Sequence, residues 1–337
     1  MTRCFNFICI FAPEKEKAKN AFYTMFSRRF LRIKVVKALY AHLTGAVDSA
    51  AVEEKNLLKG INKSYDLYPH ILSLIVDVKR YAEERIELGL KKHLPTAEDL
   101  NPNRKFVQNA LIAQLEGNDA LDMMLVERKL GWAGSPELIK HLYQKMSESE
   151  YYTNYMNSEK SSYAEDKKLV EEFYLQTVQD NEMLLEVLEE SSLMWSDDLD
   201  FILIMVLRTI GNMRKQSDFE LLPQYKNEDD EAFVKRLFAR ALVSYEENLK
   251  TVEQYTKNWD VERIALMDNV IMTTAIAELT GFDSIPVKVT LDEYIEIAKY
   301  YSTLGSSTFI NGILDKLSTD LLAKGVIVKQ GRGLVEI

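Results

Sequence analysis

The chain has 337 residues, a formal net charge of −10 at pH 7 and a hydrophobic content of 47%. Such a chain can bury one large core or two ordinary ones, which excludes disorder over most of its length. Its negative charge argues against a general coat for nucleic acids. With 13 glycines and 7 prolines to interrupt it, the chain should form long helices. No run of residues alternates like a strand, so we predict an all-α helical bundle.

The first residues contain a short apolar run, from Cys4 to Ala12, that is too short to span a bilayer. Charged residues follow directly and no small-residue cleavage site is clear, which argues against a signal peptide. We therefore expect Met25 to be the natural start and residues 1–26 to be a non-native or disordered extension. The second cysteine, Cys9, also lies here, so no disulfide framework is present and a cytoplasmic protein is expected.

The segment 27–43, SRRFLRIKVVKALYAHL, predicts the first helix. An apolar stripe runs through Leu31 and Leu39. Arg28 and Arg32 are four residues apart and share the opposite side. We therefore expect this helix to bury one face and to expose arginines on the other.

The first helix lies in a basic window. Residues 17–47 contain seven Lys and Arg side chains and no Asp or Glu. One basic stripe on an acidic chain favours a specific anionic partner. The alternative is a solvated helix face that is basic without a binding role.

Residues 44–228 are expected to be a helical insertion. Amphipathic periodicity predicts helices at about 49–62, 66–90, 104–116, 118–130 and 135–147. The polar, tyrosine-rich stretch 150–163 is predicted to be a linker or a loose helix end.

Two blocks, residues 166–211 and 229–279, resemble each other when Trp195 is placed on Trp259, at an offset of 64 residues. Each block reads as a long amphipathic helix, a tryptophan and then a strongly apolar helix, which indicates a duplicated helical hairpin. Because the apolar helix has little polar surface, it should be buried in the centre of its bundle.

The remainder is also expected to be helical, with a turn at 281–288, helices at 288–303 and 306–324, and a tail at 326–337. Ser306 or Ser307 is the predicted capping residue of the last helix.

No catalytic motif stands out. Neither glycine-rich phosphate-binding pattern, G-x-x-x-x-G-K-S/T or G-x-G-x-x-G, is present. The four histidines are too far apart for metal-ligand spacing. Acid pairs such as Glu189–Glu190 lie at predicted helix ends, where capping accounts for them. We therefore expect a protein that is not an enzyme and has no cofactor or metal.

Four motifs stand out in the C-terminal region. They are Glu278–Leu279, Ile285–Pro286–Val287–Lys288–Val289, the acidic helix from Glu293 to Lys299, and the run FINGILDK from Phe309 to Lys316. In this order they resemble the motifs of the NusB transcription antitermination family. The segment RRFLRIKVVKALY at 28–40 resembles the arginine-rich first helix of the family. The resemblance covers roughly 27–43 and 229–325, so this chain would be a long form of the family with 44–228 inserted.

The resemblance implies an RNA-binding antitermination factor that acts on ribosomal RNA transcription. Such factors bind boxA-like single-stranded RNA with the ribosomal protein NusE, alongside other Nus factors and RNA polymerase. This recognition requires cations for phosphates and flat rings for unstacked bases. By match to the family pattern, the RNA-binding residues would be Arg28, Arg29, Arg32, Tyr40, Ser306, Ser307, Thr308 and Phe309. The partner-binding residues would be Asp268 and Glu278.

Other interpretations stay open. The chain could be a protein-only helical scaffold of the transcription complex that has lost direct RNA binding. NusB-like domains also occur fused to ribosomal RNA cytosine methyltransferases, but that enzyme requires a cofactor domain with a glycine-rich loop. Among single residues, Phe309 and Tyr40 could be core aromatics, and Asp268 could make a buried hydrogen bond.

Overall fold

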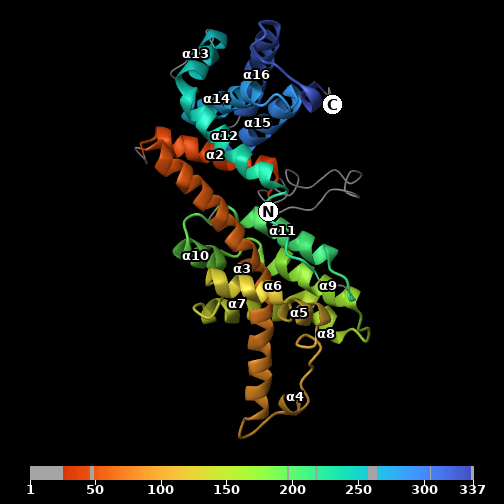
Figure 1. Cartoon of the computed structure of the whole chain (residues 1–337). Helices are drawn as coiled ribbons and strands as arrows, with labels where there is room; N and C mark the ends of the chain where they lie inside the picture. The colour runs from red at the N-terminus through yellow and green to blue at the C-terminus, as the bar shows by residue number, and fades with distance from the viewer. Residues whose placement is uncertain are drawn as a thin grey trace. The chain divides into compact units, whose positions relative to one another are not determined.

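The computed structural model describes residues 26–45, 49–195, 197–216, 219–256, 264–303 and 305–334. Their secondary structure is helical, with no β-sheet among the described residues, which confirms the predicted all-α fold (Figure 1). Met25, the predicted start, lies outside these residues. No helix in the described ranges is long and apolar enough to cross a membrane.

The described residues divide into two compact units. Unit 1 comprises residues 62–223, and unit 2 comprises residues up to 61 together with those from 224 onward. The division therefore falls at 62 and 223, whereas the sequence placed the ends of the insertion at 44 and 228. The difference arises because the start of the long helix α3 and the segment before α12 pack with unit 2.

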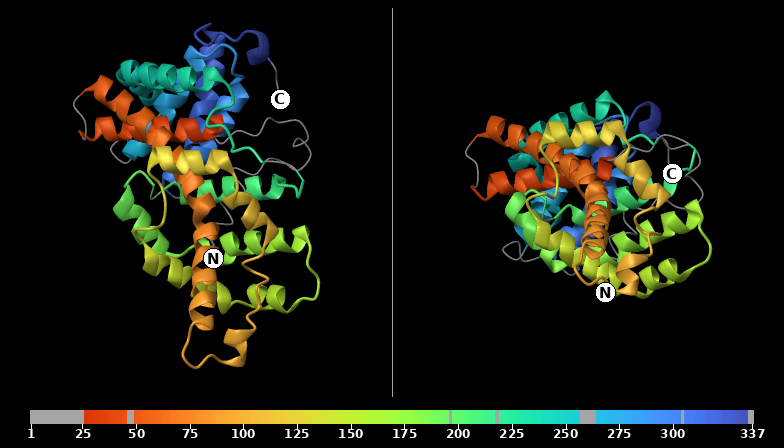
Figure 2. Two further views of the ribbon diagram at one scale, coloured as in Figure 1. Left: turned by 60° about the horizontal axis from the view of Figure 1, so that its bottom comes forward. Right: turned by 90° about the horizontal axis from the view of Figure 1, so that it is seen from below.

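Unit 2 is a bundle around one apolar helix. Its helices are α2 (Arg28–Leu43), the first part of α3 (Ala50–Leu90), α12 (Glu228–Val243), α13 (Tyr245–Tyr255), α14 (Leu266–Gly281), α15 (Val287–Tyr301), α16 (Ser306–Ala323) and the short 3-10 helix η3 (Gly331–Leu334). Helix α14 contacts α2, α12, α13, α15 and α16, and the views agree that it lies among them (Figure 2). Residues 269–277 of α14 carry no charge, so the helix can be covered on every side as predicted.

Unit 1 contains the rest of α3 and a series of shorter helices: α4 (Ala97–Leu100), α5 (Ala110–Glu116), α6 (Asp119–Arg128), α7 (Pro136–Ser147), α8 (Glu150–Asn157), α9 (Tyr163–Glu172), the π-helix η1 (Phe173–Val178), α10 (Glu182–Ser191) and α11 (Leu199–Asn212). The linker predicted at 150–163 is wrong over α8. Its polar residues form a capped helix, because the Ser149 side chain accepts a hydrogen bond from the Tyr152 N–H.

The predicted break in α3 is also wrong, because the helix is continuous from Ala50 to Leu90. Side chains at the predicted break, near position 64, make contacts within unit 1. The Ser64 hydroxyl donates to Asp198 at 2.5 Å, and the Tyr65 hydroxyl donates to the Leu222 carbonyl at 2.8 Å. Because the buried Ser64 hydroxyl has a carboxylate acceptor, its burial does not leave an unsatisfied polar group in α3.

The two similar blocks have matching helix boundaries. Shifting 163–178, 182–191 and 199–212 of unit 1 by 64 residues gives ranges that overlap α12, α13 and α14 of unit 2. Each long helix predicted from the sequence is in fact two helices. One break comes at Asp180, which has a left-handed φ of 55°, and the other comes at Ser244, the end of α12. Trp259, the predicted counterpart of Trp195, lies outside the described residues.

Candidate nucleic-acid interface

Two arginines of α2 reach carboxylates on later helices. Arg28 Nε donates to Asp230 Oδ1 of α12 at 3.0 Å. Arg29 donates through Nε and Nη2 to both carboxylate oxygens of Glu293 on α15, at 2.8 and 2.9 Å. Their side chains are 41% and 21% exposed, so both stay within reach of solvent. These ion pairs tie α2 to the C-terminal part of unit 2.

Arg32 is buried, and the prediction that it is exposed is wrong. Its side chain is 3% exposed and donates to both carboxylate oxygens of the fully buried Glu278, at 2.7 and 2.8 Å. Burial opposes the charged form, but the charge and hydrogen bonds of Glu278 outweigh it and raise the pKa of Arg32. Glu278 also accepts hydrogen bonds from Thr290 and Tyr294, so it is the centre of a core network and does not lie on a partner-binding surface.

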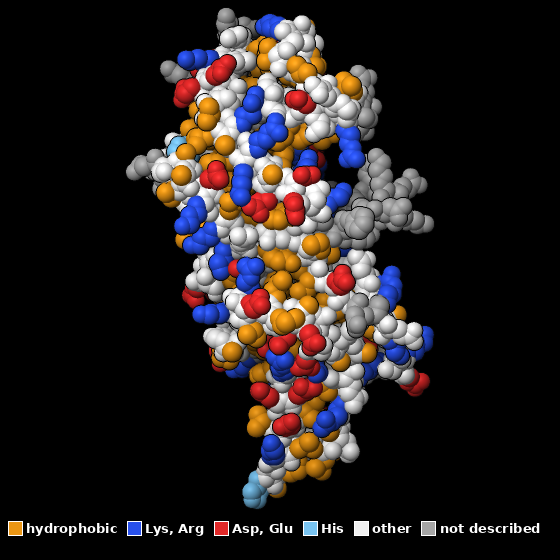
Figure 3. All heavy atoms as spheres, in the orientation of Figure 1, with side chains coloured by type: hydrophobic (Ala, Val, Ile, Leu, Met, Phe, Trp, Pro, Cys, Tyr) orange, Lys and Arg blue, Asp and Glu red, His pale blue; other side chains and the backbone are white. Residues whose placement is uncertain are grey.

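The three arginines of α2 are therefore paired with carboxylates inside unit 2. These carboxylates come from residues 230–293. The visible face of unit 2 accordingly shows Lys and Arg side chains interspersed with Asp and Glu (Figure 3). The acid-free window of the sequence does not correspond to an unbalanced positive field at the arginines.

A cation and several rings lie farther along α2. Lys37 Nζ is 5.1 Å from the ring centroid of Tyr301, which ends α15. Tyr40, three residues after Lys37, shares its side of α2, and all three side chains are half-buried. Tyr40 was a candidate from its match to the family pattern, whereas Tyr301 was not, because its contact with Lys37 depends on the tertiary fold.

The loop after Tyr301 is fixed by Asp268, a buried residue of α14. Ser302 and Ser306 both donate their hydroxyls to this carboxylate, Ser306 at 2.9 Å. Asp268 is 5% exposed, as is Ser306. Asp268 therefore makes the buried hydrogen bonds that were its alternative interpretation, and Ser306 is an internal anchor.

The predicted serine cap of α16 is wrong. The capping position is Gly305, with φ of 92°, and no side chain caps the helix. A glycine tolerates this left-handed geometry, which sends the Ser306 side chain inward to Asp268. Thr308 is exposed, and Ser307 and Phe309 are half-buried, on the first turn. An uncapped helix N-terminus favours an anion.

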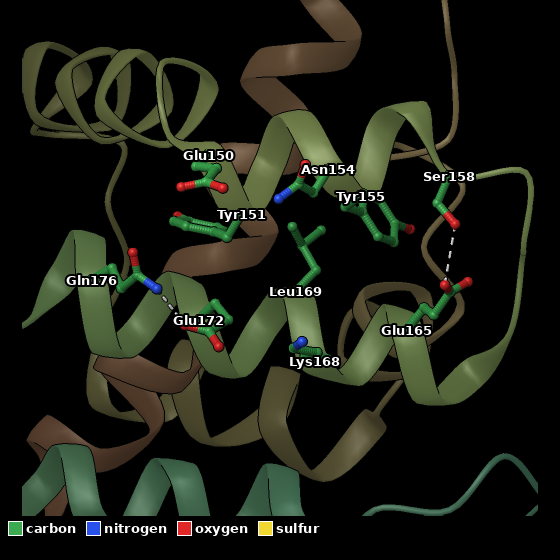
Figure 4. Close-up of a pocket in the computed structure, with 10 residues that line it drawn as sticks. All are labelled: Glu150, Tyr151, Asn154, Tyr155, Ser158, Glu165, Lys168, Leu169, Glu172 and Gln176. Carbon is green, nitrogen blue, oxygen red and sulfur yellow. Dashed lines mark hydrogen bonds between the residues drawn. The ribbon is translucent and has the colours of Figure 1, made fainter.

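A hollow of about 440 Å³ in unit 1 has more negative than positive side chains in its lining. It lies between α8 and α9, and its lining includes three carboxylates, from Glu150, Glu165 and Glu172, and one ammonium, from Lys168 (Figure 4). The Ser158 hydroxyl donates a hydrogen bond to the Glu165 carboxylate, which does not neutralise the negative charge of Glu165. This lining repels phosphates, so the candidate interface stays with unit 2.

Comparisons with known proteins match the end of unit 1 and the C-terminal part of unit 2. The sequence model of the NusB family matches residues 204–319, which run from within α11 to α16. The chain is 43% identical over 103 residues to the transcription antitermination protein NusB of Salinibacter ruber, covering 31% of this chain and 64% of that protein. It is 46% identical over 86 residues to the protein of the same name from Chloroherpeton thalassium, covering 26% of this chain and 41% of that protein.

A third relative is matched over more of its length. The chain is 33% identical over 102 residues to the transcription antitermination protein NusB of Symbiobacterium thermophilum, covering 30% of this chain and 67% of that protein. The chain thus spans between two fifths and two thirds of the relatives it matches. No solved structure matches this chain. The motifs, the all-helical unit 2 and these relatives place the chain in the NusB family.

Proposed function

We propose that this protein is a transcription antitermination factor that acts on ribosomal RNA transcription by binding boxA-like single-stranded RNA through unit 2. Its proposed partners are the ribosomal protein NusE, other Nus factors and RNA polymerase. The family relationship supports the antitermination role. The resemblance of the motifs supports the RNA and the partners.

The observation that carries the RNA site is Lys37 packed against Tyr301 at the end of α15, followed by the uncapped start of α16. Lys37 supplies a cation for a phosphate. The positive end of the α16 dipole favours a second anion, although the Ser306, Thr308 and Phe309 amides already donate to the Thr303 and Gly305 carbonyls. Tyr40, Tyr301 and Phe309 supply rings on which bases can stack. Arg29, on the same side of α2 as Tyr40, lies next to this proposed surface and is paired with Glu293.

Asp268 and Glu278 take a different part in the proposal. Both are buried, so they support the site by holding its elements in place. Asp268 holds Ser302 and Ser306, and Glu278 holds α2 through Arg32. NusE would then contact other residues of the bundle.

The double variant Lys37→Glu/Phe309→Ala is expected to weaken binding of a short fluorescent boxA-like RNA by about tenfold to a hundredfold. The variant reverses one phosphate contact and removes one stacking ring, which is worth about 1–3 kcal/mol. The slope of log affinity against log salt should become shallower by about 0.7, the value for one phosphate contact on a single strand. Fluorescence anisotropy at several salt concentrations measures both quantities.

The matched control is Lys250→Glu, which makes the same charge reversal at an exposed position of α13. It should leave the RNA affinity within about twofold of that of the unchanged protein. Lys250 is not one of the proposed RNA contacts, and salt screens exposed charges that lie far from the RNA. Equal weakening by both proteins would assign the effect to net charge and contradict the proposed surface. Reversal of Arg32 is unsuitable as a test, since it would bury a third carboxylate beside Glu278 and Glu293.

The second candidate function is a protein-only scaffold. The observation that favours it is the pairing of all three α2 arginines with internal carboxylates. It predicts no RNA binding at any salt concentration together with intact binding to NusE. The same titration, repeated with purified NusE present, separates the two candidates.

A further inference from the structure

Glu293 lies between two arginines of α2. Its carboxylate accepts two hydrogen bonds from Arg29, and its Oε2 atom is also 3.7 Å from Arg32 Nη1. The side chain of Glu293 is 19% exposed and that of Arg29 is 21% exposed. A two-pronged guanidinium–carboxylate contact has the geometry by which arginine also holds a phosphate.

We propose that Glu293 is an internal competitor for RNA phosphate. It occupies the edge of Arg29 that a phosphate would take, and it must be exchanged before Arg29 contributes to binding. The inference rests on the proposed RNA-binding function and deepens it, because it names the residue that sets the affinity of the arginine helix.

The other ion pairs of α2 do not offer this exchange. Glu278 is fully buried under Arg32, and the side chain of Asp230 is only 5% exposed beneath Arg28. A phosphate cannot reach either carboxylate edge without opening the bundle. The Arg29–Glu293 pair is half-buried at the rim, where both partners meet solvent.

The Glu293 carboxylate still has a cationic neighbour after a phosphate has displaced it from Arg29. Arg32 keeps its hydrogen bonds to Glu278 and remains within ion-pair distance of Glu293. A displaced Glu293 carboxylate therefore retains one cationic neighbour, which lowers the cost of releasing Arg29. Without Arg32 behind it, the released carboxylate would be left partly desolvated and unpaired.

Glu293→Gln tests the proposal in the full chain. Glutamine keeps a hydrogen-bond acceptor for Arg29 but removes the competing charge, so a phosphate can displace it more easily from this edge of Arg29. A short fluorescent boxA-like RNA should bind about threefold to fivefold more tightly, as expected for one partly exposed ion pair. The log–log salt slope should become steeper by about 0.7, because one more phosphate is neutralised.

The matched control is Glu296→Gln on the same helix. The carboxylate of Glu296 pairs with Lys299 on the same helix, and its replacement by glutamine changes the net charge by the same amount as Glu293→Gln. Its affinity gain should be smaller than that of Glu293→Gln, and its salt slope should not change. In an Arg29→Gln background, Glu293→Gln should give no gain. Thermal unfolding of each variant checks that the bundle is intact.

Equal affinity of the Glu293→Gln and Glu296→Gln variants, or weaker binding by Glu293→Gln with an unchanged unfolding midpoint, would overturn the inference. The proposed function would survive that result as long as the unchanged protein binds RNA. Absence of RNA binding in every protein, with NusE present and absent, would instead overturn the proposed function and the inference with it.

Discussion

Replacing Glu278 by alanine is expected to lower the free energy of unfolding by about 3–5 kcal/mol, the cost of leaving one charge of a buried ion pair without its partner. The Arg32 side chain is 3% exposed and donates two hydrogen bonds to this carboxylate. Thr290 and Tyr294 would lose the same acceptor. Because α2, α14 and α15 meet at this network, the loss should fall on the packing of the whole of unit 2.

Urea unfolding followed by far-ultraviolet circular dichroism measures the effect. Two comparison variants separate charge from shape. Glu278→Gln keeps an acceptor and should cost less than alanine, whereas Arg32→Met/Glu278→Leu removes both charges and should recover most of the stability. A loss below about 1 kcal/mol for Glu278→Ala would contradict the assignment of the network as a structural anchor, because that is the range of an exposed ion pair.

The order of elements in unit 2 could be predicted from the sequence because it depends on local signals. The uncharged run 269–277 predicts a central helix, and the Ile285–Pro286 pair predicts the turn before α15. Both features are present in the structure. The all-α class follows in the same way from periodicity and from the scarcity of glycine and proline.

The environments of the candidate site residues could not be predicted in the same way. The partner of Arg32 lies 246 residues farther along the chain, and no local pattern at 28–40 indicates a buried arginine. Ser306 had the residue type of a cap, but its hydroxyl binds Asp268 because Gly305 takes the left-handed position before it. Long-range carboxylates thus decided which cations and hydroxyls remain available.

His70 supplies the other large expected effect, in unit 1. Its ring is stacked on Trp132 with centroids 3.9 Å apart, and a second tryptophan, Trp195, lies 5.4 Å away. The residue is 6% exposed, and its buried Nδ1 atom has no hydrogen-bond partner among the described residues. Burial lowers the pKa of His70 from 6.5 to about 4, because the ring loses the water that would stabilise its charged form.

Acidification is therefore expected to destabilise unit 1 through this residue. Between pH 6.5 and about 4 the unfolded chain binds a proton at His70 that the folded chain does not, so stability is present above pH 6.5 and is lost as the pH falls. The loss approaches about 3 kcal/mol at pH 4, at about 1.4 kcal/mol per pH unit. Urea unfolding followed by tryptophan fluorescence measures it.

His70→Phe keeps an aromatic ring between the tryptophans and removes the titrating group, so its stability should fall less between pH 7 and pH 4.5 than that of the unchanged protein. His141→Gln, at an exposed position of α7, controls for loss of an ordinary histidine and should follow the unchanged protein. The unchanged protein and the His70→Phe variant carry the same titrating carboxylates, so the contribution of the carboxylates cancels in the comparison. Parallel pH profiles for the unchanged and His70→Phe proteins would contradict this prediction. They would mean that His70 is protonated in the folded state at acidic pH, which requires a hydrogen-bond acceptor that the rings of Trp132 and Trp195 do not supply.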